Sequence, residues 1–161
     1  MFIKSPVEKT SLLIWIVMLL GCALPISESE LLAIGRDEVI CHPDTLPNTI
    51  DRLSSRLVGC YNRKIKVPVV DPNSNYETLA TLSVFRQLTT RHNSDGSIDY
   101  LVTVSGVGGP AKYGLRLHLE STSRSDCQTK ITANTMNFAW GRKVGHVKLW
   151  LKDPAVGCQS W

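Results

Sequence analysis

Apolar and polar residues alternate along much of the second half of the chain, which is the period of a β-strand with one buried face. The clearest case is residues 113–120, where Tyr and Leu alternate with Gly, Arg, His and Glu. A turn signal at residues 93–96 predicts a hairpin. Further segments with strand character are residues 65–69, 79–90, 98–105, 129–138 and 147–152, and a turn is expected at 141–145.

This spacing predicts a mainly β fold, because no helical pattern separates the later strands. An antiparallel sheet has to bury its apolar face, so we expect an antiparallel β-barrel or β-sandwich of about six to eight strands. Residues 79–90 are also compatible with a helix.

One or two short helices are predicted ahead of the strands. Ser27 and Glu30 have the spacing of a capping box, which predicts a short helix that ends at Gly35 and docks on the domain. A longer helix is expected at residues 48–59, where apolar residues recur at helical spacing.

The N-terminus has the three-part pattern of a secretory signal. Lys4 and Lys9 form a basic start, residues 12–20 are all apolar, and small residues precede Pro25. The apolar run is too short to cross a bilayer, which needs about 20 residues. The pattern therefore indicates export rather than a permanent transmembrane helix.

Leu19-Leu20-Gly21-Cys22 closes this run and resembles the lipobox of bacterial lipoproteins. The resemblance implies cleavage before Cys22, acylation of its thiol, and anchoring to a membrane by acyl chains such as palmitate. Because Ala23 and not aspartate follows, the resemblance further implies a periplasm-facing lipoprotein of the bacterial outer membrane. The alternative is ordinary signal cleavage near Ala23, followed by secretion.

The predicted organisation is a signal peptide at residues 1–21, a tether at 22–36 and a single β-rich domain at 37–161. Cleavage before Cys22 removes Lys4, Lys9 and Glu8, so the formal net charge falls from +4 to +3. The remaining basic residues are scattered, whereas a nucleic-acid site needs a concentrated basic stripe. Nucleic acid is therefore not expected as a partner.

Besides Cys22 the chain has Cys41, Cys60, Cys127 and Cys158, and an even number of cysteines in an exported chain predicts two disulfides. Of the three possible connectivities we favour Cys41–Cys60 and Cys127–Cys158, because each pair brackets a local unit. No C-x-x-C pair or zinc-finger spacing occurs, so no metal site is expected.

The sequence carries no established catalytic motif such as G-x-S-x-G or H-E-x-x-H. His118 and Glu120 share a strand face with Arg116, and this grouping keeps a cell-wall hydrolase as a third hypothesis. We interpret these residues as the solvated face of a half-buried strand. We expect no catalytic residues and no cofactor. The glycine-rich residues 106–110 are expected to form a loop that contacts a partner.

A predicted hairpin near the C-terminus is the candidate binding surface. Trp150 is expected on the polar side of its strand, and an exposed Trp among cations is typical of a binding hot spot for an acidic partner or an anionic glycan. The alternative is that Trp150 packs inward while the lysines extend to solvent. The cations of this surface are Arg142, Lys143, Lys148 and Lys152.

These features predict a non-enzymatic, membrane-anchored envelope lipoprotein that acts as a protein-binding module, as an immunity protein, an inhibitor or a subunit of an envelope complex. Its expected partner is another envelope or exported protein. The alternative is a carrier of a small hydrophobic ligand. Gly59-Cys60-Tyr61 ahead of a strand meander loosely resembles the Gly-x-Trp motif of lipocalins and calycins, which implies a β-barrel with a ligand cavity.

Overall fold

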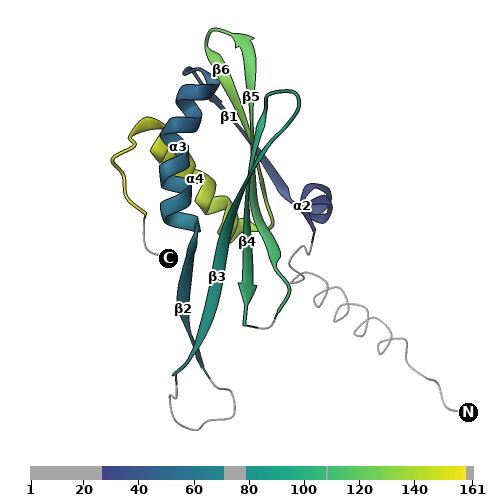
Figure 1. Cartoon of the computed structure of the whole chain (residues 1–161), viewed down its shortest axis with the longest axis vertical. Helices are drawn as coiled ribbons and strands as arrows, with labels where there is room; N and C mark the ends of the chain where they lie inside the picture. The colour runs from purple at the N-terminus through teal and green to yellow at the C-terminus, as the bar shows by residue number, and fades with distance from the viewer. Residues whose placement is uncertain (1–26, 71–78, 108, 159–161) are drawn as a thin grey trace, which may run out of the picture.

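The computed structural model describes residues 27–70, 79–107 and 109–158 (Figure 1). The predicted signal peptide and the lipobox with Cys22 lie outside the described residues. Within the described ranges, no helix is both long and apolar enough to span a membrane.

In the described residues, six strands form one antiparallel sheet in the order β1-β6-β5-β4-β3-β2, which confirms the predicted mainly β, antiparallel fold. Strands β2 to β6 follow one another as a meander, while β1 crosses over to pair with β6. The bounds are β1 (Arg36–His42), β2 (Arg63–Val70), β3 (Leu79–His92), β4 (Ile98–Gly106), β5 (Lys112–Arg124) and β6 (Cys127–Thr135).

Both predicted N-terminal helices are present. Helix α2 (Glu28–Ile34) begins with a capping box between Ser27 and Glu30 and ends at Gly35, as the spacing predicts. Helix α3 (Leu46–Tyr61) starts two residues earlier than expected, with Thr45 as N-cap and Pro47 in its first turn. Proline is well placed there, because the first helical N–H groups have no partner within the helix.

The predicted turn at residues 141–145 and strand at 147–152 are wrong, because this region is helix α4 (Phe138–Lys152). The side chain of Asn137 caps the helix by accepting from the backbone N–H of Trp140. Val147 and Leu151 are buried while Leu149 is exposed. The burial therefore follows the 3.6-residue period of a helix and not the alternation that the sequence suggested.

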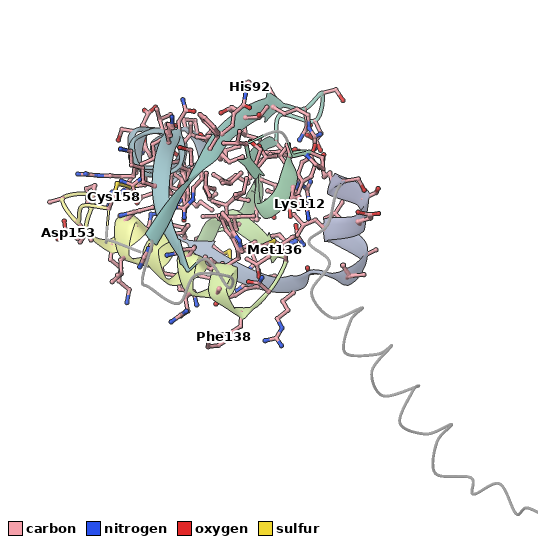
Figure 2. The ribbon with its side chains drawn as sticks, turned by 90° about the horizontal axis from the view of Figure 1, so that it is seen from below. His92, Lys112, Met136, Phe138, Asp153 and Cys158 are labelled. Atoms are coloured by element: carbon pink, nitrogen blue, oxygen red, sulfur yellow. A yellow bond between two sulfur atoms is a disulfide. The ribbon has the colours of Figure 1, made fainter. Side chains whose placement is uncertain are left out.

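The core lies between the sheet and helices α3 and α4, which cover one face, while α2 lies on the other face (Figure 1). The ring of Tyr61 stacks on Trp140 at 6.4 Å and meets Trp150 edge-on at 6.1 Å. Figure 2 shows side chains filling the space between the sheet and the helices. Because that space is occupied by side chains, the carrier hypothesis gains no supporting observation and stays a prediction.

The part of the chain that the structure describes contains two disulfides, as predicted, but the favoured pairing is wrong. The bonds are Cys41–Cys127 and Cys60–Cys158, instead of Cys41–Cys60 and Cys127–Cys158. The pairing of β1 with β6 brings Cys41 beside Cys127, 86 positions away, and the segment after α4 brings Cys158 to the end of α3. The connectivity thus depends on long-range contacts that local spacing does not reveal.

Candidate functional site

A charged cluster centred on Asp99 occupies the sheet face opposite α3 and α4. The Asp99 carboxylate is 1% exposed, and its Oδ1 lies 2.7 Å from Arg116 Nη2 and 2.9 Å from His118 Nδ1. Its Oδ2 accepts from Arg91 Nη2 at 2.7 Å and from Asn93 Nδ2 at 2.9 Å. Strands β3, β4 and β5 therefore meet at one buried carboxylate.

Helix α2 is fastened to this cluster. Glu28 accepts two hydrogen bonds from Arg91, at 2.9 and 2.7 Å, and its Oε1 lies 3.3 Å from Arg116 Nε. Leu31, three residues further along α2, is fully buried. An ion pair and an apolar anchor thus hold the helix on the sheet, as its predicted docking requires.

The electrostatics of the cluster indicate a fixed ion network. Burial raises the pKa of Asp99, but hydrogen bonds from Asn93, Arg91 and His118, with the charge of Arg116, outweigh it and lower the pKa to about 2. Hydrogen bonds to Glu28 and Asp99 raise the pKa of Arg91 above its ordinary value. Asp99 and Arg91 therefore both remain charged at neutral pH.

The structure brings together only two of the three residues in the predicted group of Arg116, His118 and Glu120. Arg116 and His118 converge on Asp99, whereas Glu120 accepts from Lys130 on the neighbouring strand at 2.8 Å. The partly exposed Glu120–Lys130 pair fits the interpretation of a solvated strand face.

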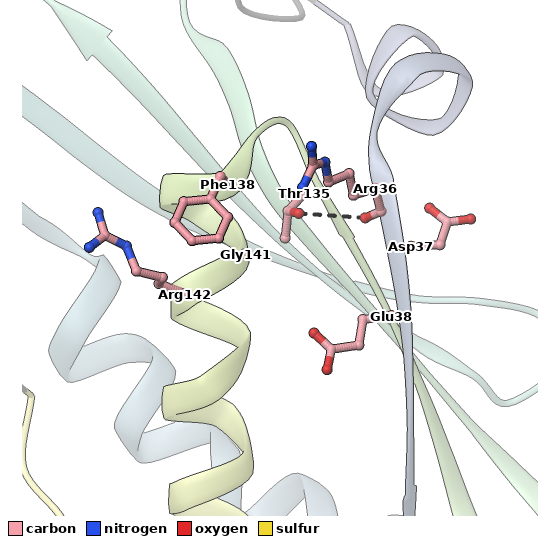
Figure 3. Close-up of a pocket in the computed structure, with 7 residues that line it drawn as sticks. All are labelled: Arg36, Asp37, Glu38, Thr135, Phe138, Gly141 and Arg142. Carbon is pink, nitrogen blue, oxygen red and sulfur yellow. Dashed lines mark hydrogen bonds between the residues drawn. The ribbon is translucent and has the colours of Figure 1, made fainter.

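A second feature is an open groove of about 350 Å³ between β1 and the start of α4 (Figure 3). Phe138 is 67% exposed there, and the guanidinium of Arg142 lies 5.6 Å from the centre of its ring. The groove is lined by Arg36, Asp37, Glu38, Thr135, Phe138, Gly141 and Arg142.

In the groove the carboxylates have hydrogen-bond partners, whereas the guanidinium groups form no ion pair with the described residues. Glu38 accepts from Lys148 of α4, and Asp37 accepts from Asn134 at 2.6 Å. For Arg36 and Arg142, by contrast, no carboxylate of the described residues forms an ion pair. Both carboxylates of the groove thus have a hydrogen-bond partner, and Glu38 is also neutralised by a cation, while the guanidinium groups are open to a ligand.

The predicted C-terminal binding surface is wrong in its central residue. Trp150 is 1% exposed and packs against Tyr61, because α4 turns it into the core. Lys143 is 8% exposed; burial first, and then the charges of Arg86, Arg142 and Arg63, lower its pKa to about 8. An exposed Trp framed by cations is therefore absent from this helix.

The other predicted residues are divided along α4. Arg142 lines the groove, Lys148 pairs with one of its walls through Glu38, and Lys152 is exposed in the last turn. The sequence pattern does not single out Arg36 and Phe138, because it places Arg36 in a tether and Phe138 at the end of a strand. The signal that indicates a helix start here is Asn137 three residues before Trp140.

The predicted contact loop at residues 106–110 joins β4 to β5, with Gly108 outside the described residues. In the part of the chain that the structure describes, no group of three or more His, Cys, Asp or Glu residues is arranged to hold a metal ion. Comparison of the chain with protein-family models, with curated proteins and with solved structures finds no match.

Proposed function

We propose that this protein is a non-enzymatic bacterial envelope lipoprotein that binds an envelope or exported protein through the groove between β1 and α4. The observation that carries the proposal is the exposed ring of Phe138 beside Arg142 in an open groove. Aromatic and arginine side chains of this kind dominate the binding free energy of many protein interfaces.

The frame around the groove supports this proposal. Cys41–Cys127 links β1, one wall of the groove, to β6, which leads directly into α4, the other wall. Cys60–Cys158 links the end of α3 to the segment after α4. A groove held between cross-linked elements loses little conformational entropy on binding, which favours affinity.

The docking of α2 limits the distance between the proposed membrane anchor and the folded domain. Glu28 and Leu31 hold α2 on the sheet, so the tether from an acylated Cys22 would end at Ser27, and not at residue 36 as the predicted tether of residues 22–36 does. Five peptide steps separate Cys22 from Ser27, and they span at most about 18 Å. An anchored chain would hold its domain close to the lipid surface.

The anchoring half of the proposal is tested by the intact mass of protein extracted from its native membrane. We expect a chain that begins at Cys22, carries acyl groups and contains two disulfides. A chain that is uncut, or that begins after Ala23 without lipid, would refute the anchor.

The binding half is tested by chemical cross-linking in envelope extract, with wild type and Phe138→Ala compared. Phe85→Ala is the matched control, because Phe85 is also exposed and also has a cation, Lys64 Nζ, 5.2 Å from its ring centre. We expect the cross-linked complex to disappear with Phe138→Ala and to persist with Phe85→Ala. Equal yields from all three proteins would exclude the groove as the binding site.

A further inference from the structure

We propose that the groove takes an acidic segment of the partner, with an apolar side chain on Phe138 and carboxylates on Arg36 and Arg142. This inference rests on the proposed function in one respect, namely that the ligand is a protein. It adds the chemistry of the segment, which follows from the charges and shape of the groove.

The sign of the charge comes from α4 and its surroundings. The helix carries four basic residues and no acidic one, and among the described residues Glu38 neutralises Lys148. Arg142 is left open, and Arg36 adds a second open guanidinium from β1. Asp37 bonds to the neutral Asn134 and keeps its negative charge, so the two guanidinium groups leave the groove with an excess of one positive charge. Carboxylates of a ligand can form paired hydrogen bonds with each guanidinium.

The neighbouring cations extend this potential beyond the groove. Burial, followed by the charges of Arg86, Arg142 and Arg63, lowers the pKa of Lys143 to about 8. Arg142 is thus close enough to Lys143 for their charges to interact, which places a second cation of α4 near the groove. The electrostatic environment on the α4 side therefore favours the same sign of ligand as the groove itself.

The shape of the groove favours a side chain between two carboxylates. Figure 3 shows Arg36 extending from β1 and Arg142 from α4, with the ring of Phe138 between them. Gly141 also lines the groove, and a Cβ at this position would approach Thr135 Oγ1 only to 3.9 Å. The wall at Gly141 thus has room that a bound side chain can fill. A small inorganic anion would use the guanidinium groups alone and leave Phe138 uncovered.

Fluorescence anisotropy tests this inference with a labelled peptide that has three glutamates on each side of one phenylalanine. We expect binding to wild type, and about tenfold weaker binding for each of Arg36→Glu and Arg142→Glu. Lys152→Glu is the control, because it makes the same change of charge about 15 Å further along α4. A peptide with lysines for glutamates should bind only the double variant Arg36→Glu, Arg142→Glu.

Two glycine substitutions test the same groove without changing its charge. Gly141→Leu should block the groove. A Cβ at Gly145, one turn later, meets no atom within 4 Å, so Gly145→Leu should bind the peptide like wild type. The inference is overturned if the acidic peptide does not bind at millimolar concentration, if the lysine peptide binds wild type equally well, or if a peptide without phenylalanine binds as tightly. Unfolding midpoints of all variants establish that each is folded.

The outcomes separate this inference from the proposed function. If Phe138→Ala abolishes the cross-linked complex while both arginine reversals leave it intact, the protein-binding function stands and the acidic segment is wrong. If neither change affects the complex, the groove is not the interface, and the inference falls together with that site.

Discussion

Glu28 and Arg91 share two hydrogen bonds of 2.9 and 2.7 Å although they lie 63 positions apart in the chain. Through this contact the first described helix is bound to the third strand of the sheet. The same Arg91 also donates to Asp99, so the fastening of α2 and the buried ion network form one unit.

Removing the charge of Glu28 should loosen α2 without unfolding the domain. In Glu28→Gln we expect about tenfold faster hydrogen exchange at the backbone amides of Leu31 and Gly35, which donate within α2. Glu120→Gln, which removes the partly exposed partner of Lys130, should leave these amides unchanged. Equal exchange in Glu28→Gln and wild type would show that Leu31 alone holds the helix.

Loss of the buried carboxylate should be far more costly. Asp99→Asn leaves Arg91 and Arg116 without their buried partner and should lower the free energy of unfolding by about 3 kcal/mol. Asp126→Asn is the control, because its ion pair with Arg124 is solvent-exposed and should contribute little to stability. Urea denaturation measures both, and similar losses would contradict the proposed role of burial.

The same carboxylate predicts a response to acid. Its folded-state pKa of about 2 lies below the ordinary value of 3.8, so the stability it contributes is present above pH 3.8 and is lost as the pH falls toward 2. Asp99→Asn should therefore flatten this part of the acid unfolding curve. An unchanged curve would mean that Asp99 does not titrate with unfolding.

Two glycines should respond oppositely to the same change. A Cβ at Gly114 would lie 2.5 Å from the ring of Trp140, so Gly114→Ala should destabilise the fold by about 1–3 kcal/mol. Gly145 lies in α4 with no atom within 4 Å of an added Cβ, so Gly145→Ala should stabilise by about 0.5–1 kcal/mol. Thermal unfolding of the two variants measures the contrast, and destabilisation by both would contradict the position of α4.

Lys143 predicts a rise in stability at mildly alkaline pH. Its folded-state pKa of about 8 lies below the ordinary 10.5, so between these values the unfolded chain binds more protons and the free energy of unfolding increases with pH. The raised pKa of Tyr61 acts in the opposite direction only above about pH 10. Denaturation at about pH 7.5 and 9.5 should show the rise in wild type and a smaller one in Lys143→Met.

Short-range sequence patterns are sufficient to predict part of this fold. The spacing of Ser27 and Glu30 predicts α2 because a capping box involves neighbouring residues alone. The turn at residues 93–96 likewise predicts the β3–β4 hairpin, in which His92 pairs with Ile98. Patterns of this kind are complete within a few residues.

Other features depend on contacts that no local pattern contains. Val147, Leu149 and Leu151 alternate like a strand, and only the packing of α4 against the core shows that Leu149 faces solvent. Asp99 has the spacing of an exposed strand residue, and its burial follows from the cross-strand arginines and the docking of α2. The groove has no local sequence signal for the same reason, since Arg36 and Phe138 come together only after β1 has paired with β6.

Site-specific photo-cross-linking in intact cells tests the central claim most directly. A benzophenone-bearing phenylalanine is placed at position 138 in one strain and at the control position 85 in another. A binding function at the groove predicts one discrete cross-linked partner from position 138 and none from position 85. No adduct from position 138, or the same adducts from both positions, would contradict it.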